Sequence, residues 1–220
     1  NLTSVREAIN QYILLIKKLT HMLNSEQNKE LENYMMQYME EAEYIAVNYE
    51  KMISQLHSKF REDVKRRLEE NLDQKIFSIE DGLAIERVYS QLWIKLKNPS
   101  EPEFKFGIAS FSGKGHLQGN LFVGLLYEGK EDLIRFSEKN GIDNQPWIHI
   151  DLILQEDKKV INLREKSTLQ ILAQPESSHY KILMEKVVAQ SLNFIEELMK
   201  NLASQNLNFN KPDLAIKSKI

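Results

Sequence analysis

The chain has 220 residues, of which 42% are hydrophobic and 28% are charged, a balance typical of a folded globular protein. Its 29 basic and 32 acidic residues give a formal net charge of −3, which excludes a positive field over the whole chain that would hold nucleic acid non-specifically. No cysteine is present, so disulfides, a thiolate nucleophile and a cysteine-based zinc site are excluded. This composition favours a cytoplasmic location, although it also fits a bacterial exterior.

The first 75 residues are predicted to form a helical region. Apolar residues at spacings of three and four indicate a first helix that ends near Leu23, a second from Glu26 to about Glu40 and a third that continues to about Leu72. No Gly or Pro occurs between Asn1 and Asp81, so we expect only a kink or short turn near residues 39–43. The longest apolar run, residues 12–16, is far too short to cross a bilayer, and no membrane partner is expected.

A sheet is predicted after the helical region, because period-two alternation replaces the helical period and six of the eight glycines fall within 23 residues. The expected strands cover residues 92–97, 104–109, 121–127, 147–155 and 160–163. A short helix at residues 130–139 and a long final helix after Ser177 and Ser178 are expected as well.

The order of these elements predicts an α+β fold. It consists of an N-terminal hairpin or bundle of long helices, followed by a mainly antiparallel sheet of about five strands that is packed by the C-terminal helix. We expect a helical region at residues 1–75, a sheet domain at 76–205 and a mobile tail at 206–220.

One candidate metal site combines Asp81 with Glu103 and Lys105. Two carboxylates can hold Mg²⁺, and a lysine can stabilise charge or position the attacking water. Glu103 and Lys105 would share one face of a strand, but Glu103 follows a polar turn at residues 98–102, where burial would not fix a metal. A solvated turn is the favoured interpretation.

The glycine-rich segment from Ser112 to Gly119 invites comparison with a phosphate-binding loop. No Ser or Thr follows Lys114, and strand residues follow the segment where a phosphate loop would have a helix. The favoured interpretation is a flexible hairpin loop, from which Lys114 and His116 could still touch a phosphate backbone.

A second candidate site lies on the strand at residues 147–155. Strict alternation places Trp147, His149 and Asp151 on one face, where Trp93 could join them in a groove that stacks bases or binds another ligand. The favoured interpretation is that the N-terminal helices cover these side chains and that His149 pairs with Asp151 or with the backbone.

The segment from Val5 to Thr20, with the sequence VREAINQYILLIKKLT, resembles a helix downstream of the catalytic core in bacterial PD-(D/E)XK nuclease superfamily proteins. The similarity of layout extends over residues 4–200, and the first helix is its specific part. The resemblance implies a parent nuclease that uses Mg²⁺, with the metal-binding motif upstream of this chain. It also implies a role in defence against foreign DNA, so DNA is a candidate partner.

We therefore expect an accessory part of a hydrolase that recognises a substrate or partner, with Lys95 and Lys114 as candidate DNA contacts. Because the chain begins with Asn1 and no leader precedes the first helix, we expect a fragment of a longer protein. The alternative is an interaction module that forms a homodimer through the N-terminal helices. A third reading makes the fragment itself a metal nuclease with Asp81, Glu103 and Lys105.

Overall fold

The structure is a computed structural model that describes residues 10–12, 25–97, 104–127 and 147–204. The chain forms two compact units, residues 1–53 and residues 54–220, and the division falls within a helix. The boundary predicted after residue 75 coincides with the change from helices to strands, between the end of α3 (Met39–Asn71) and the start of β1 (Phe77–Asp81). No helix in the described ranges is long and apolar enough to cross a membrane.

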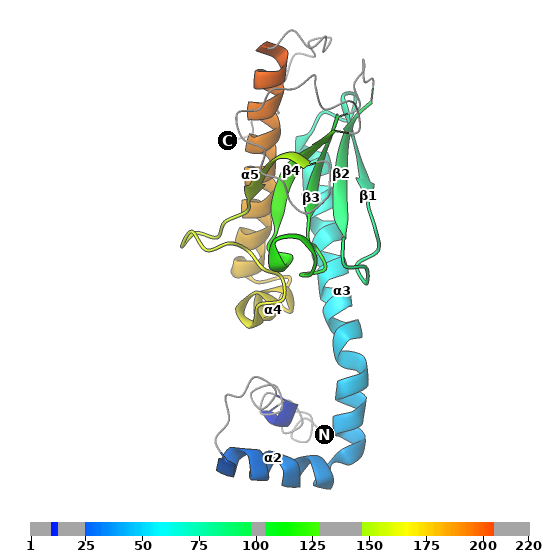
Figure 1. The fold of residues 1–220 in the computed structure, drawn as a ribbon, viewed down its shortest axis with the longest axis vertical. Helices are drawn as coiled ribbons and strands as arrows, with labels where there is room; N and C mark the ends of the chain where they lie inside the picture. Colours follow the sequence, from blue (N-terminus) through cyan, green and yellow to red (C-terminus); the bar gives the residue numbers. More distant parts are fainter. Residues whose placement is uncertain (1–9, 13–24, 98–103, 128–146, 205–220) are drawn as a thin grey trace. The chain divides into compact units, whose positions relative to one another are not determined.

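The first unit contains α2 (Ser25–Gln37) and the beginning of α3 (Met39–Asn71) (Figure 1). Tyr38 separates the two helices, one residue before the predicted break, and Ala42 N still donates to Tyr38 O at 3.0 Å. Of the predicted first helix, the structure describes residues 10–12, which are helical, and the remainder lies outside the described residues. The ring of Tyr12 contacts that of Tyr49 at a centroid distance of 4.9 Å.

The second unit contains a five-stranded antiparallel sheet, which confirms the predicted α+β class. The strand order is β1-β2-β3-β4-β5, so each strand pairs with its neighbours in sequence. Two helices follow the sheet, and the elements are β1 (Phe77–Asp81), β2 (Gln91–Leu96), β3 (Phe104–Ala109), β4 (Phe122–Tyr127), β5 (Trp147–Leu152), α4 (Lys166–Leu172) and α5 (Ser178–Ser204).

Two elements differ from those expected. The sheet begins with β1, a strand that the sequence pattern did not predict. The strand predicted at residues 160–163 is not part of the sheet, and this segment forms only the isolated bridges Leu154–Val160 and Asn120–Asn162. The short helix α4 was also not expected. The helix predicted at residues 130–139 and the tail at 206–220 lie outside the described residues.

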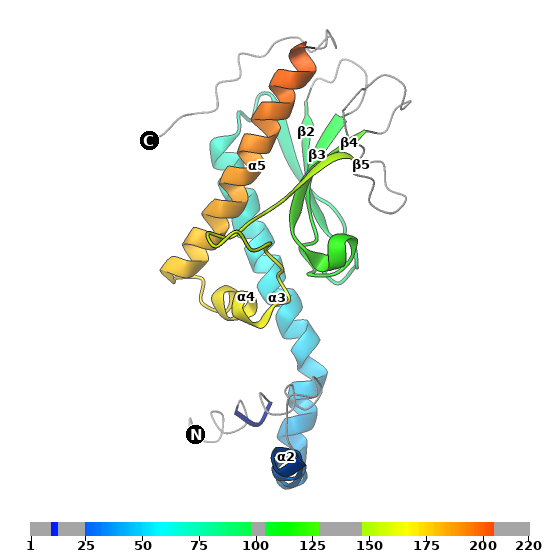
Figure 2. The same cartoon turned by 60° about the vertical axis from the view of Figure 1, so that its left-hand side comes forward.

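One face of the sheet packs on α5 and on the part of α3 that belongs to the second unit, as Figure 2 shows. The stripes of both helices and alternate residues of the strands form one apolar core, because alternate strand side chains point to the same face. Its fully buried members include Phe60, Val64, Leu68, Leu92, Ile94, Phe106, Ile108, Leu125 and Val187.

A buried polar contact joins α3 to α5 beside this core. The Tyr180 hydroxyl donates to Asp63 Oδ2 at 2.6 Å, and Arg66 Nη2 donates to Asp63 Oδ1 at 2.6 Å. Burial and then the hydrogen bond to Asp63 raise the pKa of Tyr180 well above its usual range. The contact therefore orients the two helices without leaving the Asp63 carboxylate buried and unpaired.

Candidate functional site

The face of the sheet that α3 and α5 leave uncovered carries a cluster of aromatic and basic side chains. We call this cluster the aromatic face, and its members are Trp93, Lys95, Lys105, Phe122 and Trp147. The register places Trp93, Lys105 and Phe122 on the same side of β2, β3 and β4, opposite the main core. Neither α3 nor α5 lies on this side of the sheet (Figure 2).

The two tryptophans form the centre of the aromatic face. Their rings stack with centroids 5.6 Å apart and an interplanar angle of 20°, and Phe122 meets Trp147 edge-on at 5.2 Å. Lys105 Nζ lies 4.5 Å from the centroid of the Trp93 ring, a cation–π contact. Trp147 is buried, whereas Trp93 is partly exposed.

Two glycines create the space for these rings. Gly107 on β3 lies opposite Gly124 on β4. A Cβ at Gly107 would come within 2.7 Å of Trp93 Cζ3, and a Cβ at Gly124 within 2.6 Å of Trp147 Cε3. The indole rings therefore lie against bare backbone, and a glycine inside a strand marks such a close approach.

Lys95 lies on the same side of the sheet and is held by a neighbouring strand. Its Nζ atom contacts Glu80 Oε2 on β1 at 2.6 Å, and it sits opposite Lys105 in the register. Two lysines in adjacent strands place positive charge beside Trp93. Lys95 and Lys105 are therefore both candidates to contact an anionic ligand.

The structure separates His149 and Asp151 from Trp147. A register shift opposite Leu125 and Leu126 bulges β5 at Ile148, so Trp147 pairs with Leu126 while His149 pairs with Leu125. His149 consequently faces α5, where its ring stacks on Phe194 at 5.6 Å. Its Nε2 atom lies 3.9 Å from Asp151 Oδ1, as expected if His149 pairs with Asp151. The two side chains do not share a groove with Trp147.

His116 is not on an exposed tip, which corrects the expectation of an open hairpin loop. It begins the 3₁₀ turn η1 (His116–Gly119), is 6% exposed, and packs against Tyr89 at 4.5 Å and Phe122 at 6.3 Å. Ser110 and Gln118 in the same loop adopt positive φ. Such packing keeps His116 from a phosphate backbone, whereas Lys114 is exposed.

Asp81 and Lys105 of the candidate metal set lie on opposite faces of the sheet. Asp81 lies on the α3 side of β1, where Lys65 Nζ contacts it at 2.7 Å and Arg61 Nε at 3.6 Å. Lys105 lies on the opposite face of the sheet, and Glu103 is outside the described residues. In the described ranges no group of three or more His, Asp or Glu could hold a metal ion.

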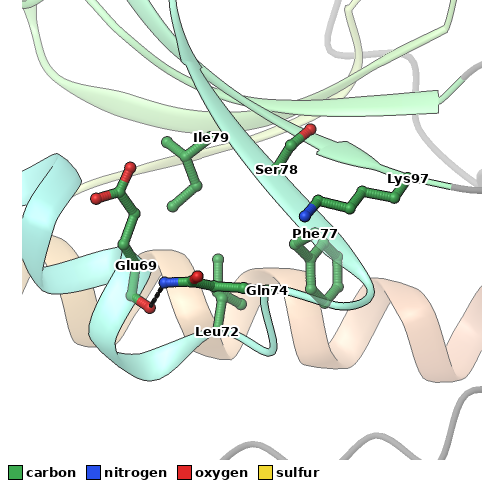
Figure 3. A pocket seen from close by; sticks show the side chains of 7 residues that line it. All are labelled: Glu69, Leu72, Gln74, Phe77, Ser78, Ile79 and Lys97. Atoms are coloured by element: carbon green, nitrogen blue, oxygen red, sulfur yellow. Dashed lines mark hydrogen bonds between the residues drawn. The ribbon is translucent and has the colours of Figure 1, made fainter.

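A cleft with a volume of about 330 Å³ opens between the end of α3 and β1 (Figure 3). Apolar and charged side chains both line it, and they are Glu69, Leu72, Gln74, Phe77, Ser78, Ile79 and Lys97. The sequence gives no signal for this cleft, because β1 has only two apolar residues and does not stand out as a strand.

Comparison with known proteins does not assign a function to the aromatic face. No protein family, curated protein or solved structure matches this chain.

Proposed function

We propose that this chain is a non-catalytic recognition module whose aromatic face binds single-stranded nucleic acid. The observation that carries the proposal is the Trp93–Trp147 stack with Lys105 against it, on the face that α3 and α5 leave uncovered. Aromatic rings stack on bases of any sequence, and lysines neutralise the neighbouring phosphates. An accessory role beside a PD-(D/E)XK nuclease, with defence against foreign DNA, is part of this proposal.

Stacking of a base on Trp93 can offset the loss of the cation–π contact with Lys105. An exposed cation–π contact stabilises by about 0.5–1 kcal/mol, whereas stacking of a base on an aromatic side chain contributes about 1–3 kcal/mol. The Lys105 ammonium group, which lies 4.5 Å from the Trp93 ring centroid, is the candidate contact for a neighbouring phosphate. In this proposal a base stacks on the Trp93 ring, and the Trp147 ring, which stacks on Trp93, holds that ring in position. Lys105 supplies the positive charge for the phosphate.

Charge distribution favours a single strand over a duplex. The first unit has five basic and eight acidic residues, and the second has 24 of each, so neither offers the broad positive surface that duplex DNA requires. The second unit has no net charge, so we expect it to bind nucleic acid through a short local site in which bases stack on aromatic rings.

Fluorescence anisotropy with a labelled oligothymidylate at low salt tests the proposal. We expect Lys105→Gln to weaken binding and to reduce the salt dependence by about one released ion. Lys75→Gln, which removes the same charge from an exposed turn outside the aromatic face, should bind like the native chain. No anisotropy change at low salt, or equal loss in both variants, would remove the aromatic face as a nucleic-acid site.

A separate observation favours the interaction module as a second candidate function. Among the described residues of the first unit, four large apolar side chains are more than 60% exposed, and they are Met36, Met39, Tyr44 and Val47. Met36 lies on α2 and the other three lie in the first turns of α3, and large exposed apolar side chains of this kind can make protein contacts. A homodimer through these helices predicts a mass in sedimentation that rises with concentration and returns to the monomer value in Tyr44→Ser with Val47→Ser.

A further inference from the structure

β1 is an edge strand with unused backbone groups. Among the described residues its strand partner is β2, and it lies at one end of the sheet order. Lys97 N donates to Ile76 O at 2.8 Å, and Gly82 N donates to Gln91 O at 2.9 Å, so the hydrogen-bonded positions are the even-numbered residues of β1. The N–H and C=O groups of Ile79 and Asp81 therefore point away from β2, toward the open edge.

The cleft of about 330 Å³ lies along this same edge. Leu72, Phe77 and Ile79 supply apolar surface, and this volume is at the lower end of the range of about 300–1,000 Å³ for ligand pockets. Figure 3 shows the carboxylate of Glu69 and the extended side chain of Lys97 on opposite sides of the cleft. An added strand would direct alternate side chains toward α3 and thus into this space.

The Glu69 carboxylate is available to a ligand. Gln74 Nε2 donates to the backbone carbonyl of Glu69 at 3.2 Å, so this hydrogen bond does not involve the carboxylate. In the part of the chain that the structure describes, the carboxylate forms no ion pair. It stands beside apolar side chains, which is the arrangement that receives a long basic side chain, with its aliphatic stem on the apolar surface and its charge at the carboxylate.

We propose that β1 and the cleft bind an extended peptide segment that adds as a further antiparallel or parallel strand and places one Arg or Lys side chain against Glu69. Main-chain hydrogen bonds to Ile79 and Asp81 provide affinity, and the cleft provides specificity for the basic side chain. Lys97 on the opposite wall repels a basic group and directs it to Glu69. This surface is distinct from the aromatic face, so either can fail without the other.

A pair of modified peptides tests the strand addition on the full chain. The probe is a fluorescein-labelled heptapeptide of alternating threonine and valine with a central arginine, measured by anisotropy. N-methylation of every second backbone nitrogen on one parity should abolish binding, while the peptide methylated on the other parity should bind normally, because an added strand pairs through one edge only. Equal binding of the two methylated peptides, or no binding of the parent peptide, would overturn the proposal.

A matched pair of variants tests the cleft. Glu69→Gln should weaken binding of the arginine peptide about tenfold, the range expected for loss of one charge-assisted hydrogen bond. Glu86→Gln removes the same charge from an exposed loop position and should bind like the native chain. Equal affinities in all three proteins would overturn the assignment of Glu69. A mass that rises with concentration without peptide, and is suppressed by the parent peptide, would assign this edge to a second copy of the chain and also overturn the proposal.

Discussion

The two faces of the sheet are built in different ways from the same strands. The face toward α3 and α5 is filled by large apolar side chains at alternate positions, such as Ile94, Phe106 and Val123. The opposite face has glycine at two facing positions of β3 and β4, where the indole rings lie on the backbone. The first face provides stability, whereas the second holds amphipathic side chains, of which Trp93 is partly exposed.

The largest effect should come from opening the helix-covered face. Phe106 is 1% exposed and packs edge-on against Phe194 of α5. Phe106→Ala should lower the free energy of unfolding by about 3–5 kcal/mol, because it removes an aromatic ring and leaves a cavity. Urea denaturation followed by circular dichroism measures this. A loss below about 1 kcal/mol would contradict a single core shared by the sheet and α5.

A smaller effect is expected from filling the backbone space under the indoles. Gly107→Ala places a Cβ against both Trp93 and Trp147 and should cost about 2–3 kcal/mol through overpacking. The same substitution in a Trp93→Leu background should cost clearly less, since one of the two rings is gone. Equal costs in the two backgrounds, measured by urea denaturation, would show that Gly107 does not support the stack.

The polar contact beside the core should have an intermediate effect that depends on pH. Tyr180→Phe leaves Asp63 without its hydroxyl donor and should cost about 1–2 kcal/mol at neutral pH. Because the pKa of Tyr180 is raised in the folded state, the native chain loses stability as pH rises above about 10, where the unfolded tyrosine ionises and the folded one does not. The variant should lose less over this range, and parallel stability curves for the two proteins above pH 10 would argue against the buried hydroxyl.

The smallest effect is expected at the exposed end of β1. The side chain of Asp81 is 46% exposed, and surface ion pairs contribute about 0–1 kcal/mol. Asp81→Asn should therefore change the free energy of unfolding by less than about 1 kcal/mol, and by less still in 1 M salt. A loss of several kcal/mol would mean that Asp81 is buried against Lys65 and Arg61 more deeply than the structure shows.

Much of the helix-covered face could be predicted from the sequence. Strict alternation identified β2, β3 and β4, and the three-and-four spacing of apolar residues identified α3 and α5. β1 escaped detection because Phe77 and Ile79 are its only apolar residues and the strand ends in Glu80 and Asp81. Its place in the sheet is set by pairing with β2, which no local pattern encodes.

The candidate site was predicted less completely, because the side on which a side chain lies depends on local irregularities of the backbone. Trp147 lies beside Trp93 as predicted, but the bulge at Ile148 turns His149 to the side of α5, and alternation cannot anticipate an extra residue in a strand. His116 was assigned to an exposed loop because glycines usually indicate turns, yet these glycines permit a tightly packed one. Gly107 and Gly124 each lie inside a predicted strand, at a position that faces away from the core. A glycine at such a position indicates that another group approaches the backbone closely, here an indole ring.

The most direct test of the aromatic face uses its two tryptophans, which are the only ones in the chain. A ¹⁵N-labelled sample gives two indole N–H signals, and Trp93→Phe assigns them. On titration with oligothymidylate at low salt, we predict that the Trp93 signal shifts most and that the Trp147 signal follows it. Binding detected by anisotropy while both indole signals stay in place would contradict recognition through this face.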